Sequence, residues 1–452
     1  MAGSYNYITW GQLRGELLQR LQDPGAVYTP AAEADIYLTE SLRLLNSTTF
    51  LWNVDYVLSF NPGDTWKTLN VAGSPRQRTV TDTDLYDQME AMLLEPMSGG
   101  TWTGTNQYNI GILSAALQYR RDELLLQSAA NPVNLLLESP LLSVRTNLPD
   151  STLDVFRVRW IAQDSSMPYV LGREDVGTAN AFQPWRGAQP GAPDSWLITA
   201  NPPLSFDCSC PPNQPGTWDT ILSFSGASFA PPAATLVGIP DDWTPALVYG
   251  ALADVLANSP EGRDAARSKY CLERYEQMKR AMLSLPWLIE ASVASLSVDT
   301  PSYKEMDAWL QDWETRQPVD DPQIVVGGVD FVALAPFVPA GGAQVQAVLN
   351  VVGNAPIPAN DDAEVQLSRD GVDAVLAYAQ HVASFKMGGA NFAVTMPLLE
   401  QFEAYCRKKN AEYAALGIFR PDLLGEGSRA DEADPRFEKD IEEPRHGKQT
   451  RR

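Results

Sequence analysis

The chain has 452 residues, of which 44% are hydrophobic and 20% are charged, and its formal net charge at pH 7 is −22. At roughly 100–200 residues per domain, this length allows several domains and a core large enough to need neither disulfides nor metals. The acidic balance argues against a surface that tracks nucleic-acid phosphates, which needs clustered Lys and Arg, and against adhesion to an anionic membrane. It is compatible with simple solubility, and also with a wall past which DNA moves without adhering, because like charges repel.

Cysteine and histidine are scarce in the chain. The cysteines are Cys208, Cys210, Cys271 and Cys406, and the histidines are His381 and His446. A Cys-Ser-Cys pair does not supply the four ligands of a structural zinc site, so we expect no metal and no other cofactor. We expect unpaired thiols in a reducing compartment. The N-terminus lacks the pattern of a secretory signal, and the apolar stretch 324–352 is too interrupted to span a bilayer, so we expect no membrane association and assembly in a cytoplasm.

The first sixty residues predict a helix pair followed by a strand. Thr9 can cap the first helix, with Gln12 as its capping-box partner, and the turn at 23–25 ends that helix. Pro30 suits the first turn of the second helix, because a proline at that position loses no hydrogen bond. The run 51–60 then changes to the period of a strand.

Residues 61–235 predict a β-rich insert with long loops. The segment contains one helix, at 110–127, and short strand-like runs at 153–161, 169–171, 196–199 and 220–224. Turn clusters rich in Pro and Gly separate these runs. The tryptophans of the segment are Trp102, Trp185, Trp196 and Trp218. They suit either of two roles, as aromatic platforms that stack on sugars or as core residues and loop anchors.

Residues 236–290 predict the clearest helix pair. Asp241 and Asp242 stand where a helix N-terminus favours negative charge and a capping oxygen. Apolar residues then recur at helical spacing over 248–256, and again over 271–285 at alternating spacings of four and three, which is typical of a seam that packs against another helix. The residues that we expect to form such seams with another subunit or partner are Val248, Leu252, Val255, Tyr275, Met278 and Met282.

The last third of the chain predicts three further parts. Residues 291–342 are interrupted by prolines and predict an extended linker, and residues 343–424 predict a C-terminal helical module. Residues 425–452 predict an extended tail, because they hold too few large apolar residues to bury a core. The pairs Tyr270-Cys271 and Tyr405-Cys406 recur in the two later helix pairs. Internal duplication and chance similarity between amphipathic helices both explain that recurrence.

No motif in the sequence indicates catalysis. The chain has neither the glycine-rich loop of P-loop nucleotide hydrolases nor the Gly-x-Ser-x-Gly elbow of α/β-hydrolases. His381, the one histidine away from the C-terminus, lies in a predicted apolar helix and suits a structural or exposed role. The 56 carboxylates single out no acid pair for glycoside cleavage. We therefore expect that the protein is not an enzyme, with an unrecognised hydrolase as the least supported alternative.

The segment 239–285 resembles a pattern of tailed-phage head-to-tail adaptor (connector) proteins. In that family a strand ending in Pro and an acidic residue leads into a helix with small and aromatic residues, and a short loop leads to a second helix with Tyr, Glu, Lys and Met or Leu. The similar residues here are Ile239-Pro240-Asp241-Asp242-Trp243, Leu247-Val248-Tyr249-Gly250-Ala251-Leu252 and Tyr270–Lys279. The N-terminal helix pair and the strand with Trp52 also look similar to the opening of family members. The resemblance covers roughly 5–60 and 236–290, and this chain departs from the family in its large insert and its third helical module.

The resemblance implies an α+β fold with a helical adaptor core, formed by the N-terminal and middle helix pairs, a β-rich insert and an additional C-terminal helical module. It implies a homo-oligomeric ring, typically twelve-fold, that docks beneath the portal protein in the virion neck and contacts tail or neck proteins. Its lumen would let DNA pass without sequence-specific binding. The alternative is a tail-side hub or a receptor- or carbohydrate-binding tail component, carried by the tryptophans of the insert.

Overall fold

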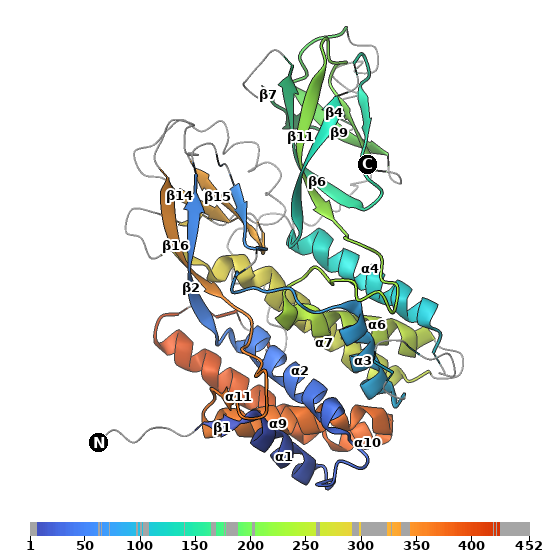
Figure 1. The fold of residues 1–452 in the computed structure, drawn as a ribbon, viewed down its shortest axis with the longest axis vertical. Coiled ribbons are helices and arrows are strands. Elements are labelled where there is room, and N and C mark those ends of the chain that lie inside the picture. The colour runs from blue at the N-terminus through green and yellow to red at the C-terminus, as the bar shows by residue number, and fades with distance from the viewer. Residues whose placement is uncertain are drawn as a thin grey trace, which may run out of the picture.

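The computed structural model describes residues 7–61, 64, 66–71, 73–95, 98–99, 102, 108–139, 141–163, 169–175, 177, 189–200, 204–258, 263–291, 298–299, 323–326, 328–335, 344–418, 420–421 and 423–424. These residues form an α+β fold in which a helical body carries two β lobes at one end (Figure 1). The predicted tail 425–452, much of the predicted linker 291–342, and Trp185 lie outside the described residues.

The helical body contains most of the core. Its helices are α1 (Trp10–Arg20), α2 (Ala31–Thr49), α3 (Asp82–Leu93), α4 (Ile110–Ser128), α6 (Thr244–Asn258), α7 (Ala265–Ser284), α9 (Arg369–Ala383), α10 (Gly389–Val394) and α11 (Met396–Ala415), with 3-10 turns η2 (Asp241–Trp243), η3 (Leu285–Leu288) and η5 (Phe385–Met387). In the described part of the chain, no helix combines the length and the apolar composition that crossing a membrane requires.

Local capping explains where several of these helices begin. The predicted capping box of α1 is present, since the backbone N–H of Gln12 donates to Thr9 Oγ1 (3.3 Å) and that of Thr9 donates to Gln12 Oε1 (3.1 Å). Asp264 caps α7 by accepting from the backbone N–H of Arg267 (3.0 Å), and Ser368 caps α9. These helix starts are set by residues within four positions of the cap.

The helices share one hydrophobic core, which places the C-terminal helices beside the N-terminal ones. The apolar stripe of α9 packs against α1 and α2, and α11 packs against α9 and α2. A short antiparallel pair of strands, β1 (Ile8–Thr9) and β17 (Glu364–Val365), joins the same two regions. The helices predicted within 343–424 are present, and because an amphipathic stripe needs a partner, their apolar stripe packs against the N-terminal helix pair.

The first β lobe is assembled from segments that are far apart in sequence. One sheet contains β12 (Glu290–Ala291), β16 (Val345–Val352) and β2 (Asn53–Phe60), and the other contains β13 (Val298–Asp299), β14 (Gln323–Val326), β15 (Phe331–Ala335) and β3 (Trp66–Thr68). β2 and β16 pair antiparallel along their whole length, from Asn53 opposite Val352 to Phe60 opposite Val345. Apolar side chains of both sheets meet in one core. The linker prediction for 291–342 is thus corrected in part, since β14 and β15 are paired strands of this lobe.

The second β lobe is built from the insert. One sheet contains β4 (Pro132–Ser139), β11 (Gly216–Phe224), β6 (Thr152–Ala162) and β7 (Tyr169–Val170), and the other contains β5 (Arg145–Asn147), β10 (Ser205–Cys208), β9 (Ser195–Ala200) and β8 (Gly172–Arg173). The four predicted strand runs overlap β6, β7, β9 and β11. The predicted boundary at 61 is corrected, because α3 and α4 pack in the helical body and the lobe itself begins at Pro132.

Candidate functional site

The six residues predicted to form a seam with another subunit lie inside the chain's own core. Val248, Leu252 and Val255 are on α6 and are at most 5% exposed; Tyr275, Met278 and Met282 are on α7 and are at most 1% exposed. All six belong to the single core of the helical body, where α6 packs against α7 and α4. The prediction is corrected accordingly: amphipathic spacing identified a helix seam, but the seam joins helices of one chain.

Close approach of three helices makes this seam tight at Gly250. A Cβ atom at that position would lie 2.9 Å from Cγ of Arg120 on α4 and 3.0 Å from a ring carbon of Tyr275 on α7. Arg120 also lies over the Tyr275 ring, 4.8 Å from its centroid, and forms an ion pair with Asp254 on α6 (2.6 Å). The small residues in the resemblance segment therefore serve helix packing.

Asp241 and Asp242, predicted as helix-terminal charges, hold distant parts of the chain together. Asp241 Oδ1 accepts the backbone N–H groups of Thr79 (2.8 Å) and Val80 (3.1 Å). Asp242 Oδ2 accepts the side-chain amide of Asn46 on α2 (2.5 Å) and the backbone N–H of Ala355 (2.7 Å). The two carboxylates thereby join α2, η2, the strand-like segment before α3, and the segment after β16, at the point where the helical body meets the first lobe.

Burial sets the protonation of Asp242. Its side chain is 0% exposed, and burial raises the pKa of this carboxyl to about 7, even though hydrogen bonds from Asn46 and Ala355 favour the charged form. Asp242 Oδ1 lies buried without a hydrogen-bond partner. This group therefore titrates near neutral pH.

Two arginines extend the junction to the bases of both lobes. Arg76 donates from Nε to the carbonyl oxygen of Val352 at the end of β16 (2.9 Å), and Arg78 donates to the carbonyl oxygens of Gly238 and Ala130. Asp330, beside β15, forms ion pairs with both guanidinium groups. Burial lowers the pKa of each arginine to about 9, so both remain cationic at neutral pH. The charges fix the lobes on the body and do not face solvent.

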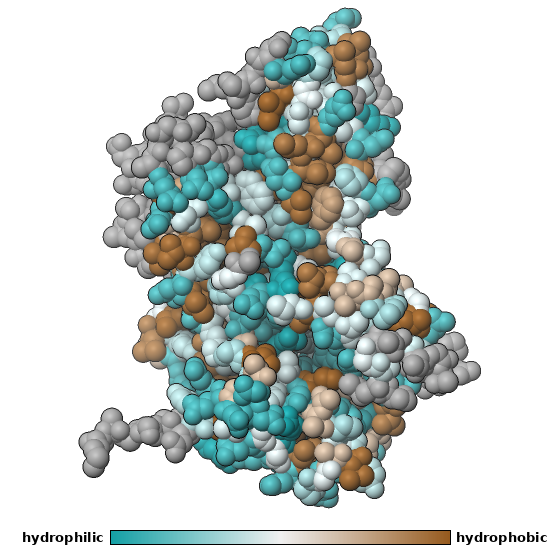
Figure 2. All heavy atoms as spheres, in the orientation of Figure 1, coloured by the Kyte–Doolittle hydropathy of each residue, from teal (hydrophilic) through white to brown (hydrophobic). Residues whose placement is uncertain are grey.

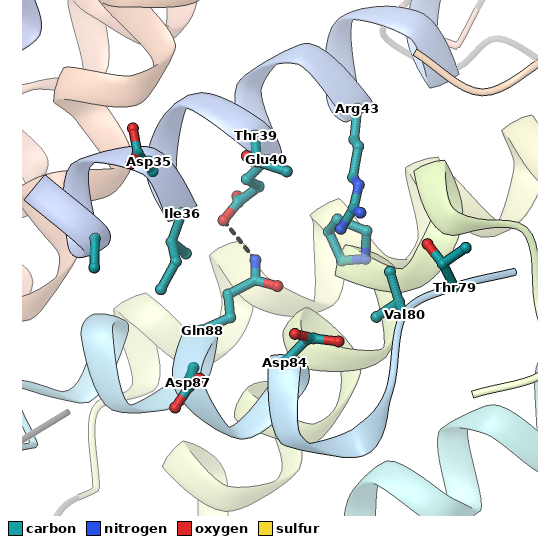
Figure 3. A pocket seen from close by; sticks show the side chains of 12 residues that line it. Asp35, Ile36, Thr39, Glu40, Arg43, Thr79, Val80, Asp84, Asp87 and Gln88 are labelled. Atoms are coloured by element: carbon teal, nitrogen blue, oxygen red, sulfur yellow. Dashed lines mark hydrogen bonds between the residues drawn. The ribbon is translucent and has the colours of Figure 1, made fainter. Parts of the chain in front are cut away.

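A pocket of about 440 Å³ lies between α2 and α3 (Figure 3). Its lining residues are Ala32, Asp35, Ile36, Thr39, Glu40, Arg43, Thr79, Val80, Asp84, Asp87, Gln88 and Pro245. Glu40 points from α2 toward Gln88 of α3, which donates to it at 2.6 Å, and the Glu40 carboxylate also accepts from Tyr249 and from Tyr378 (3.1 Å). Burial raises the pKa of Glu40, and the hydrogen bonds from Tyr249 and Gln88 oppose that effect.

At the base of the pocket, the Glu40 carboxylate therefore already accepts hydrogen bonds from three side chains of the same chain. Glu40 connects α2 to α3, α6 and α9 through these donors. The surrounding carboxylates favour a cationic group over an anionic one. Within the residues that the structure describes, no three His, Cys, Asp or Glu side chains are grouped to hold a metal ion.

His381 has a structural place in the body. It is 0% exposed, its Nδ1 forms a hydrogen bond with Thr395 Oγ1 (2.9 Å), and its ring stacks on Phe392 with centroids 4.3 Å apart. Burial, and then the charge of Arg274, lower its pKa to about 3, so the ring is neutral. Packing between α9 and the start of α11 accounts for this histidine.

Burial decides between the two roles left open for the tryptophans. Trp196 and Trp218 are 0% exposed, and both lie in the core of the second lobe around Phe206. Trp102 is 5% exposed and donates to the carbonyl oxygen of Tyr108. The interpretation as sugar-stacking platforms is corrected for these three residues, because a stacking platform must present a ring face to solvent.

The cysteines are all free thiols, and Cys208, Cys271 and Cys406 are buried. Burial raises the pKa of Cys208 to about 12. These thiols are therefore not activated nucleophiles.

The chain matches no model of a known protein family, and no curated protein matches its sequence. The functional assignment consequently depends on the residues and their geometry. Sequence reasoning missed the pocket. Its walls come from α2, from α3 and from Thr79, Val80 and Pro245, and only tertiary packing brings these segments together.

Proposed function

We propose that the chain is a structural subunit of a tailed-phage neck, a head-to-tail adaptor that assembles into a ring below the portal protein and joins the capsid to the tail. One observation carries the proposal. The two separate segments that resemble the adaptor family, 5–60 and 236–290, pack together in one helical body, where α2 contacts η2 and α7. Asn46 and Asp242, one from each segment, are joined by a 2.5 Å hydrogen bond.

The shape of the chain supports a subunit with two different ends. The helical body forms one end and the two β lobes form the other (Figure 1). A neck subunit must contact one component on its capsid side and another on its tail side. Buried ion pairs at the junction of body and lobes, around Arg76, Arg78 and Asp330, hold the two ends in a fixed relation.

The charge of the chain supports passage of DNA without adhesion. With 56 acidic and 34 basic residues, a ring of copies carries a strongly negative field that repels phosphates. Assembly and not chemistry is the proposed role, and no catalytic residue is part of it. The alternative, a carbohydrate-binding tail component, loses the support of Trp196 and Trp218, since both rings are buried.

Co-sedimentation with purified portal protein tests this proposal. We expect the chain to move with the portal assembly at the salt concentration used for virion assembly. An unrelated globular protein of similar net charge should stay at the top of the gradient, which controls for nonspecific association. If the chain sediments as a monomer and no fraction contains it together with the portal assembly, the proposal is contradicted.

A further inference from the structure

The outer face of α4 is apolar although no part of the described chain covers it. Ile112, Tyr119 and Leu126 are spaced seven apart and are 61%, 62% and 40% exposed, and Ala115 between them is exposed as well. The opposite face of the same helix packs in the core. A helix that is apolar on two faces is ordinarily buried on both, and the spacing 112, 115, 119, 122, 126 is that of a helix–helix seam.

This surface is also poor in charge. Residues 110–119 include no charged residue in a chain of net charge −22. Along the course that α4 takes in Figure 1, the surface in Figure 2 is brown and pale with little teal. Asp122 is the one charged residue within the seam positions, and its side chain is 29% exposed.

A second exposed helix face, on α11, has complementary features. Ala404, Lys408, Ala411 and Ala415 are exposed at alternating spacings of four and three. Small side chains at three of these positions leave room for large ones from a partner helix. Lys408, 59% exposed, is the one charge among them, and it lies in the longest run of cations in the chain, 407–409. It also forms an exposed ion pair with Asp370 (3.4 Å).

Placed antiparallel, the two seams match position by position. The opposed residues are Ala115 opposite Ala415, Tyr119 opposite Ala411, Asp122 opposite Lys408, and Leu126 opposite Ala404. Large apolar side chains of α4 then meet small ones of α11, and the single acidic position meets the single basic one. A charged residue within an apolar seam favours the register that places a residue of opposite sign directly across from it.

We propose that the outer face of α4 binds the outer face of α11 of a second copy of this chain, in this antiparallel register. α4 and α11 lie on different sides of the helical body (Figure 1), so these two helices of one copy do not meet. A contact between two different faces propagates from copy to copy and generates a ring where its rotation closes. Because copies of net charge −22 repel one another, association is favoured where one surface is poor in charge and the other carries cations. The proposal names the subunit contact of the ring and rests on the proposed function.

Cysteine cross-linking tests the register, in a background where the partly exposed Cys210 is replaced by serine. The variant Tyr119→Cys with Ala411→Cys places opposed thiols in the seam, whereas Tyr119→Cys with Ala404→Cys is a matched control displaced by one heptad, about 10 Å along the helix. Under mild oxidation, with and without portal protein, we expect a ladder of dimers, trimers and larger species from the first variant only. The proposal would be overturned by equal ladders from both double variants or by the absence of cross-linking in assembled material. Dimers of the single variant Tyr119→Cys would also overturn it.

Charge reversal tests the ion pair independently. We expect Asp122→Lys or Lys408→Asp alone to weaken self-association about tenfold, and the double variant to restore it, while circular dichroism shows an unchanged fold. Failure of the double variant to restore association would count against the register. Cross-linked ladders that do not co-sediment with portal would refute the adaptor role and keep the contact. Rings that bind portal but give no cross-linked ladder would refute the contact between α4 and α11 and keep the adaptor role.

Discussion

Replacing Leu252 by alanine should lower the free energy of unfolding of the isolated chain by about 2–5 kcal/mol, independently of protein concentration. Leu252 is 0% exposed in the core between α6, α7 and their neighbours, so the truncation leaves a cavity inside one chain. Chemical denaturation at two widely separated concentrations measures this loss. A seam between subunits would instead give a change that depends on concentration.

Ile112→Ala provides the matched control for that experiment. Ile112 is 61% exposed on α4, so its truncation should change the unfolding free energy of the monomer by less than about 0.5 kcal/mol. It should, however, weaken self-association through the proposed α4 contact. If both variants destabilise the monomer equally, the distinction between the internal seam and the external one is wrong.

Replacing Asp242 by asparagine should stabilise the chain at pH 8 and have a smaller effect at pH 5. The folded state raises the pKa of this carboxyl from 3.8 to about 7, so it binds the proton more tightly than the unfolded state does. Stability contributed by the protonated group is therefore lost as pH rises between these two values. The loss from pH 5 to pH 8 is on the order of 2 kcal/mol. An asparagine oxygen can still accept from Asn46 and Ala355, and the amide has no charge to bury.

The pH dependence of the unfolding free energy, compared between wild type and Asp242→Asn, measures this contribution. The two curves should converge toward pH 4, diverge between about pH 4 and pH 7, and keep a constant separation above neutrality. Asp150→Asn, at an exposed loop position, serves as the control and should follow the wild-type curve. Parallel curves for wild type and Asp242→Asn would show that burial does not shift this group.

Features set by neighbouring residues were the ones that the sequence could predict. The capping box of Thr9 and Gln12 and the strand at 153–161 depend on residues only a few positions away, and the structure has both. The pairing of β2 with β16 could not be predicted, because its partners are far apart in sequence; Asp55 and Asn350, for example, are 295 residues apart. The hydrogen bond from Asn46 to Asp242 is missing from the sequence-based account for the same reason.

Amphipathic spacing predicted the buried faces at the candidate site but not the helices that cover them. The periodicity of α6 and α7 correctly indicates a buried face, but it carries no information on whether the covering helix belongs to the same chain. For α4 the inward stripe, with Leu113 and Leu117, and the outward stripe, with Ile112 and Tyr119, interleave along the sequence and are not separated by periodicity. Only the exposed fraction of the side chains in the folded chain shows whether an apolar stripe is covered by another helix.

Electron microscopy of the chain mixed with purified portal protein tests the central claim most directly. We predict closed rings of this chain stacked coaxially on the portal, with neighbouring copies in contact through their helical bodies. Portal assemblies without added density, beside dispersed monomers of this chain at concentrations well above those of virion assembly, would contradict the assignment as a head-to-tail adaptor.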